Sequence, residues 1–249
     1  MSLSSSLRPV DPISLPYVWR VEDLAAEQAV IPTGHPLLDA QLPGGGWPVG
    51  SMIEILQSRP AQHVWQLLLP GLARSLSLHA GPVILIGAPH EPFAPSLRAR
   101  GVPGERLLWV KSDKESARLW AAEQALRCAQ AAAVLAWVPQ ARSDALRRLH
   151  LAAQQQGRLL FVFRGLQARQ SASPARLRLG VEGVDTLELR IFKRRGPPLE
   201  EALHLAPHSE RLAALLEARK RRASTAWVPS KAPPLPERSH VLDRTAAFT

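Results

Sequence analysis

The sequence predicts an α/β fold in which a mainly parallel, twisted sheet is flanked by helices and ends in antiparallel strands. Two observations predict this fold. Between residues 51 and 163, five short apolar segments alternate with longer amphipathic ones, which is typical of strand–helix–strand units around a sheet buried on both faces. After residue 165, apolar and polar residues alternate, which favours antiparallel strands with one solvent-facing side.

Length and composition indicate one such domain with polar ends. The chain has 249 residues, of which 46% are hydrophobic, and this is enough to bury a core. We expect the Ser/Pro-rich residues 1–16 to be disordered and the main domain to span residues 17–206. Residues 207–222 predict a C-terminal helix, and the Pro/Ser-rich residues 223–249 predict a flexible tail.

The elements of the main domain follow in chain order. Thr33 is expected to cap a helix with Pro36 in its first turn, and a Gly/Pro loop follows at 43–50. Strands are then expected at 51–56, 82–87, 106–111, 132–138 and 158–163, and alternating strands at 177–182 and 185–195. Helices are expected at 61–79, 94–101, 115–130 and 142–156.

Charge and cysteine content indicate which kinds of partner and which cellular compartment to expect. The net charge of +10 favours an acidic partner, either nucleic acid or an acidic protein surface, and equally fits a charge that only aids solubility. The single cysteine, Cys128, falls in a predicted helix and is expected to be a small buried residue, with no disulfide within the chain. We therefore expect a cytoplasmic protein. The N-terminus lacks a signal-peptide core, and no segment approaches the ~20 apolar residues of a membrane span.

The turn after the first core strand is the place where many α/β proteins hold a phosphate. Such turns need glycines for converging N–H groups, a lysine for charge, and a Ser or Thr hydroxyl for Mg²⁺. The turn QSRPAQHVW contains no glycine and no lysine followed by Ser or Thr, and Pro60 removes a donor. Arg59 and His63 are the only nearby cations in the sequence, so we expect at most a single bound anion there.

Several segments together resemble a known family. The segments IPTGHPLLDAQLPGGGWPVGSMIEI and PVILIGAPHEPFAPSLRARGV are similar to the core of RecA-type recombinases, and the resemblance covers about residues 30–205. The segments LPGGGWP, LLLPGLA, LLWV, LWAAEQALR and AVLAWVP resemble the ImuA family, which are RecA-like accessory factors of damage-induced mutagenesis. The SulA-type cell-division inhibitors are a related, shorter group.

The resemblance implies that the nucleotide site has lost its chemistry. The recombinase phosphate loop would fall on Gln57 to Val64, with its lysine near His63 and its magnesium-binding hydroxyl near Val64. Pro89 stands where the water-activating glutamate is expected, and Trp137 stands where the next core strand should end in an acidic residue. Because phosphoryl transfer needs all of these groups together, we expect no cofactor and no ATPase activity.

The resemblance also implies a cationic contact with a neighbouring molecule. FKRRGPP places Lys193 and Arg195 where recombinases carry the Lys-x-Lys that reaches the ATP of the next subunit, with Arg194 between them. On a strand, residues two apart point to one face, so this pair is expected to face a partner's phosphate or carboxylate. The alternative is a charged hairpin end that is merely solvated.

A basic loop at 164–178 occupies the position of the second DNA-binding loop of recombinases. Its arginines would give weak, sequence-independent contacts to phosphates, although no aromatic residue lies among them to stack on bases. The alternative is an exposed flexible loop. The candidate DNA contacts are Arg164, Arg169, Arg176 and Arg178.

The predicted C-terminal helix is a second candidate contact. Leu212, Leu215 and Leu216 share one side of it, which would either pack on the chain's own domain or enter a partner's groove. The ImuA resemblance implies two partners, RecA and ImuB, the latter being a catalytically inactive relative of Y-family polymerases. A damage-induced replicative polymerase paralogue often completes that set.

The sequence thus favours a non-catalytic RecA-like accessory protein of damage-induced translesion DNA synthesis. Two alternatives remain: a SulA-like inhibitor that binds the tubulin-like division protein, and a divergent RecA-type ATPase. The extra C-terminal helix and tail argue against the first alternative. The sequence contains no HExxH or CxxC motif, and no metal site is expected.

Overall fold

The computed structural model of the chain describes residues 29–60, 63–128, 130–183, 186–196, 199, 201–205 and 218. The chain divides into two compact units, residues 1–207 and 208–249, and every described residue except Ala218 belongs to the first. The predicted N-terminal segment and tail lie outside the described residues, as do the C-terminal helix positions Leu212, Leu215 and Leu216.

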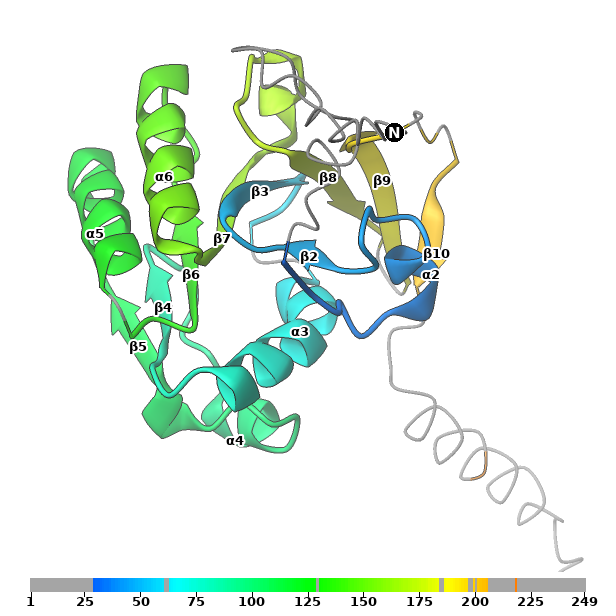
Figure 1. Cartoon of the computed structure of the whole chain (residues 1–249), viewed down its shortest axis with the longest axis horizontal. Helices are drawn as coiled ribbons and strands as arrows, with labels where there is room; N and C mark the ends of the chain where they lie inside the picture. The colour runs from blue at the N-terminus through cyan, green and yellow to red at the C-terminus, as the bar shows by residue number, and fades with distance from the viewer. Residues whose placement is uncertain are drawn as a thin grey trace, which may run out of the picture. The chain divides into compact units, whose positions relative to one another are not determined.

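One eight-stranded sheet forms the centre of the first unit (Figure 1), with the strand order β10-β9-β8-β3-β7-β6-β4-β5. All neighbouring pairs from β8 to β5 are parallel, whereas the β8–β9 and β9–β10 pairs are antiparallel. This arrangement confirms the predicted α/β fold with its antiparallel end. The strands are β3 (Ser51–Gln57), β4 (Val83–Ile86), β5 (Leu107–Val110), β6 (Ala133–Trp137), β7 (Leu159–Gly165), β8 (Leu177–Glu182), β9 (Leu187–Lys193) and β10 (Leu203–Leu205).

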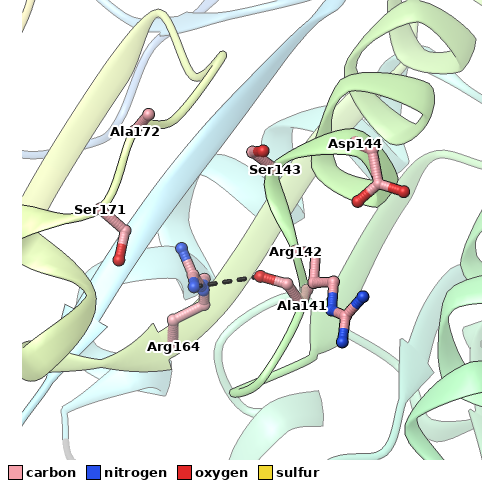
Figure 2. Close-up of a pocket in the computed structure, with 7 residues that line it drawn as sticks. All are labelled: Ala141, Arg142, Ser143, Asp144, Arg164, Ser171 and Ala172. Carbon is pink, nitrogen blue, oxygen red and sulfur yellow. Dashed lines mark hydrogen bonds between the residues drawn. The ribbon is translucent and has the colours of Figure 1, made fainter.

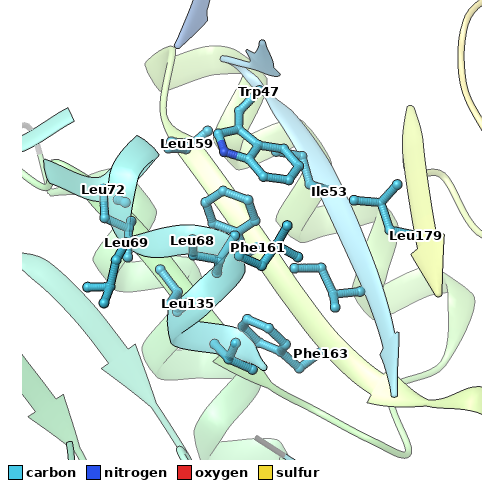
Figure 3. Packing of buried hydrophobic residues seen from close by; sticks show 14 of the residues in the cluster. Trp47, Ile53, Leu68, Leu69, Leu72, Leu135, Leu159, Phe161, Phe163 and Leu179 are labelled. Carbon is cyan, nitrogen blue, oxygen red and sulfur yellow. The ribbon is translucent and has the colours of Figure 1, made fainter. Parts of the chain in front are cut away.

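Helices cover the two faces of the sheet because successive residues of a buried strand point to opposite sides. On one face, Leu68 of α3 packs in a cluster with Ile53 and Phe161 (Figure 3). On the other face, Leu126 and Leu146 belong to a second apolar cluster. The helices are α3 (Val64–Leu78), α4 (Ala94–Arg98), α5 (Glu115–Arg127) and α6 (Ser143–Gln156), with short 3₁₀ helices η1 (Gly104–Arg106) and η2 (Leu166–Gln170).

The Gly/Pro loop places a tryptophan deep in the core. The strands β1 (Val30–Ile31) and β2 (Trp47–Pro48) form a small antiparallel pair. The Trp47 ring is fully buried and meets the Phe161 ring edge-on, with the ring centroids 5.3 Å apart. A Cβ at Gly71 of α3 would lie only 2.7 Å from Trp47 Nε1, so this helix position needs a glycine for the tryptophan to pack against it.

The helix before this loop begins later than predicted. The helix α2 spans Pro36–Asp39, with Pro36 in its first turn as expected, but its N-cap is His35 rather than Thr33. Thr33 instead accepts a hydrogen bond from the backbone N–H of His35 at 3.0 Å. The His35 ring lies with Nε2 3.1 Å from the Leu67 carbonyl of α3.

Two further expectations are wrong. The expected solvent-facing side holds for β9 but not for β8, which is buried from Leu177 to Val181. Its second side is covered because Arg178 is ion-paired and the Phe192 ring lies over Gly180. Cys128 is not a buried helix residue: α5 ends at Arg127, and Cys128 is an exposed C-cap with extended backbone.

Candidate functional site

The turn between β3 and α3 uses its side chains for internal contacts. His63 precedes the helix in the left-handed conformation, with φ of 56°, a backbone region that favours glycine. Its ring lies between two internal partners, with Nδ1 2.6 Å from Gln66 Oε1 and Nε2 3.0 Å from the Gly183 carbonyl. The residue that stands at the expected lysine position is thus held toward the β8–β9 connection.

The next position is equally unsuited to phosphate chemistry. Val64 is the first residue of α3 and is 2% exposed, so its side chain belongs to the apolar core where a magnesium-binding hydroxyl would otherwise stand. Trp65 is partly buried and packs against the same cluster. Apolar packing therefore occupies the position at which the resemblance implies a magnesium-binding hydroxyl.

A cavity of about 610 Å³ opens at the carboxyl ends of the parallel strands. It brings together three of the five residues that the resemblance placed at the nucleotide site: Gln57, Pro89 and Trp137. His63 and Val64 are not among its lining residues. The two positions at which the resemblance implies acidic residues therefore lie in one cavity, where they present a proline ring and an indole.

Aromatic rings form much of the wall of this cavity. Trp137 is stacked on Phe163, with ring centroids 4.2 Å apart and an interplanar angle of 11°. Trp109 also lines the cavity, and Lys111 Nζ lies 4.0 Å from the centroid of its ring. Arg118 crosses between strand ends, donating from Nε to the Ser112 carbonyl at 2.6 Å and from Nη1 to the Trp137 carbonyl at 3.4 Å.

A buried ion cluster lies on the α6 side of the sheet, and sequence reasoning assigned its members differently. Glu54, in the middle of β3, is 0% exposed. It accepts hydrogen bonds from Arg164 Nη1 at 2.9 Å and from Arg178 Nε at 2.5 Å. The two arginines are 9% and 8% exposed, so the expectation that they lie in an exposed DNA-binding loop is wrong.

The two arginines of this cluster also donate hydrogen bonds to backbone carbonyls of loops at the end of the sheet. Arg178 also donates to the carbonyls of Ala168 and Arg169, at 2.8 and 3.1 Å, and so holds η2. Arg164 donates to the Ala141 carbonyl at 3.1 Å, across a second cavity of about 520 Å³ at the start of α6 (Figure 2). One signal in the sequence could have revealed this: a lone glutamate inside an apolar strand predicted to be buried on both faces needs buried cationic partners.

The other two candidate DNA contacts lie at the surface. Arg169 is exposed, and its guanidinium carbon is 4.3 Å from the centroid of the Phe192 ring. Arg176 is also exposed, and its backbone N–H donates to the Met52 carbonyl. The structure thus separates the four arginines into a buried pair and an exposed pair.

The strand that was expected to carry the basic residues to position 195 ends two residues earlier, at position 193. β9 stops at Lys193, so Arg195 is not in the strand, and the argument from strand alternation does not apply to this pair. Lys193 Nζ donates to the Ser173 carbonyl at 3.2 Å. Arg194 donates to the backbone carbonyl of Gln41 and to its Oε1, the latter at 3.1 Å.

Two partly buried histidines have shifted titrations. Burial lowers the pKa of His35, although the carbonyls of Leu67 and Gln66 act in the opposite direction. Burial also lowers the pKa of His150, and the positive charges of Arg176 and Lys193 lower it further. In keeping with a neutral ring, His150 Nδ1 accepts a hydrogen bond from the Met52 N–H at 3.1 Å.

The described part of the chain offers no metal site and no membrane span. No group of three or more His, Cys, Asp or Glu side chains gathers within it in a way that would hold a metal ion. None of the helices in the described ranges has the length and apolar character needed to cross a bilayer.

Comparison with known proteins gives partial matches. No protein-family model matches the chain. Protein ImuA from two strains of Caulobacter vibrioides, NA1000 / CB15N and ATCC 19089 / CIP 103742 / CB 15, is 32% identical over 136 residues, covering 51% of this chain and 54% of the relative. Cell division inhibitor SulA from Edwardsiella piscicida is 34% identical over 93 residues, covering 37% of this chain and 55% of the relative.

The chain therefore spans about half the length of the curated relatives it matches. These matches confirm the resemblance that the sequence motifs predict: the chain is similar to ImuA over half of its own length and to SulA over a shorter stretch.

Proposed function

We propose that this chain is a non-catalytic, RecA-like accessory protein of damage-induced translesion DNA synthesis, which acts by binding RecA and the polymerase relative ImuB. The observation that carries the proposal is the state of the β3–α3 turn. His63 is engaged with Gln66 and Gly183, and Val64 is buried, so the two positions at which the resemblance implies a lysine and a metal-binding hydroxyl supply neither group. The similarity to ImuA supports the pathway.

The absence of catalysis follows from the chemistry of the cavity walls. Pro89 and Trp137 cannot activate water or bind Mg²⁺, and no nearby carboxylate takes over both roles, because Asp113 is the single acidic residue among those that line the cavity. We place the protein in the cytoplasm with its DNA-bound partners, and a damage-induced replicative polymerase paralogue belongs to the same proposed assembly.

Two measurements test this proposal. Titration of the purified full chain with Mg-ATP should give no saturable binding, and no ATP hydrolysis should be detected under conditions in which RecA is active. Co-purification should retain RecA and ImuB, and repeating it without residues 207–249 shows which partner needs the C-terminal region. Recombinase-like ATP hydrolysis, or loss of both partners with the full chain, would refute the proposal.

The basic residues after β9 are our proposed contact with RecA. Lys193 and Arg195 are both exposed, and the ammonium group of Lys193 donates to the Ser173 carbonyl. The double variant Lys193→Glu/Arg195→Glu should weaken RecA binding. Arg74→Glu/Arg147→Glu, which changes the charge equally at two exposed helix positions, is the matched control. Equal RecA binding by both double variants would remove this contact from the proposal.

The similarity to SulA favours one rival function, a division inhibitor that binds the tubulin-like division protein. Co-sedimentation of the chain with polymers of that protein separates the two functions. Binding there, together with no retention of RecA or ImuB, would favour the rival.

A further inference from the structure

We propose that the cavity at the carboxyl ends of β3, β4, β6 and β7 is a docking socket for an aromatic side chain flanked by carboxylates on a partner protein. This inference deepens the proposed function and rests on it in one respect: the proposed function implies that the molecule bound in the cavity is a protein. It does not depend on which of the proposed partners carries the segment.

The walls of the cavity suit a flat ring. Trp137 and Phe163 form a stacked pair with nearly parallel planes, and Trp109 adds a third ring. Pro60, Pro89 and Pro139 also line the cavity. Aromatic and proline surfaces of this kind bind a ring by stacking and burial, at little cost in side-chain entropy. The volume of about 610 Å³ is that of a pocket able to take a bulky side chain with its neighbours.

The charge around these walls selects for carboxylates. Lys111 and Arg118 line the cavity, and Asp113 is the single carboxylate in its lining, whereas the third cation there, Arg164, is paired with Glu54. Lys111 is exposed and stands over the Trp109 ring, and the described residues offer it no acidic partner. Arg118 uses Nε and Nη1 for backbone carbonyls, which leaves Nη2 for an incoming oxygen. A ring with acidic neighbours therefore complements both the walls and the rim.

The same groups do not suit a nucleotide. Arg164 is already bound to Glu54 and the Ala141 carbonyl, so its charge is largely neutralised within the fold. Proline at positions 60 and 89 removes backbone N–H donors from two of the surrounding loops. Phosphates are held by several converging N–H groups, whereas one exposed ammonium group and one available guanidinium nitrogen suffice for surface carboxylates.

The socket is preformed rather than assembled by its occupant. Arg118 passes directly over Gly87, where a Cβ would lie 2.6 Å from its Cδ and Nε, and Gly87 has the positive φ of 64°. The close approach lets one side chain link the ends of β4 and β6 to the loop after β5. A socket fixed in this way loses little entropy on binding.

Binding of short peptides to the full chain tests the proposal. The probe is a blocked, fluorescently labelled Glu-Asp-Trp-Asp-Glu peptide, followed by fluorescence anisotropy. Two comparison peptides replace Trp by Ala, or all acidic residues by Lys. Ser58→Trp fills the mouth of the cavity, and Lys111→Glu reverses the charge of its rim. The matched controls are Ser116→Trp and Lys114→Glu, at exposed positions outside the lining, and thermal melting confirms that each variant is folded.

We expect the Trp peptide to bind the wild-type chain and both control variants equally, and more tightly than either comparison peptide. Ser58→Trp should abolish binding, and Lys111→Glu should weaken it about fivefold. Three results would each overturn the proposal. The first is that the Trp peptide does not bind the wild-type chain, and the second is that it binds Ser58→Trp as tightly as the wild-type chain. The third is that deoxyadenosine monophosphate binds the chain more tightly than the peptide does and displaces it.

The outcome separates the socket from the proposed function. If RecA and ImuB co-purify with the chain but the peptide does not bind, the socket is wrong and the function stands. If the peptide binds as expected while neither protein co-purifies, the socket stands and the function is wrong.

Discussion

Glu54 is the residue whose surroundings most constrain this protein, because it is a fully buried carboxylate held by two nearly buried arginines. Removing one member of a buried ion group leaves uncompensated charge in the interior. Glu54→Ala should therefore lower the free energy of unfolding by about 3–5 kcal/mol, measured by urea denaturation. Glu105→Ala is the control, since it breaks a salt bridge whose partners are 65% and 71% exposed, and it should change stability little. Equal effects of the two substitutions would contradict this view of Glu54.

His150 links the stability of the fold to pH. Its pKa is lowered in the folded chain, so the unfolded chain binds the proton more readily, and the stabilisation is present above the ordinary pKa of 6.5. It should be lost as the pH falls from there through the folded pKa. His150→Asn keeps an acceptor for the Met52 N–H but cannot titrate, so its unfolding free energy should fall less between neutral and mildly acidic pH. His90→Asn, at an exposed histidine, is the matched control, and equal slopes for the two variants would contradict the assignment.

At the scale of elements, regular hydrophobic patterns were sufficient to predict helices and strands, whereas short or irregular segments gave no such pattern. The apolar runs predict β3 to β7 and the amphipathic segments predict α3 to α6, each within a few residues of the observed bounds. The pairs β1–β2 and β9–β10 include strands of two or three residues, too short to show any periodicity. The burial of β8 depends on Glu54 and Phe192, which only the folded chain brings beside it.

The contact between the Gly/Pro loop and α3 should depend on Gly71. An alanine there would gain up to about 1 kcal/mol in helix propensity, but its Cβ would lie 2.7 Å from Trp47 Nε1 in a closely packed core. Overpacking of this kind costs about 1–3 kcal/mol, so Gly71→Ala should destabilise the fold on balance. The urea midpoint, followed by tryptophan fluorescence, measures the change. Gly104→Ala, whose Cβ would meet its neighbour at an ordinary 3.5 Å, should not be destabilised; equal midpoints would contradict the close contact.

At the scale of the whole molecule, the sequence predicted which residues share the cavity better than how their side chains pack there. Pro89 and Trp137 follow or end core strands, so their place in one cavity follows from strand order alone. The stacking of Trp137 on Phe163 and the crossing of Arg118 depend on register between distant strands. The sequence pattern assigned four arginines to one basic loop, but two of them form ion pairs with the buried Glu54. A linear pattern of basic residues does not reveal such pairs.

The net charge of +10 and the exposed pair Arg169 and Arg176 predict weak, sequence-independent DNA binding by the whole chain. Each phosphate contact contributes to the slope of log affinity against log salt concentration, so Arg169→Ala/Arg176→Ala should reduce the steepness by about 1.5 on single-stranded DNA. Arg98→Ala/Arg100→Ala, at two exposed positions near α4, is the matched control and should leave the slope almost unchanged. If both double variants reduce the slope equally, the attraction comes from the overall charge of the molecule, and Arg169 and Arg176 do not form a DNA-binding surface.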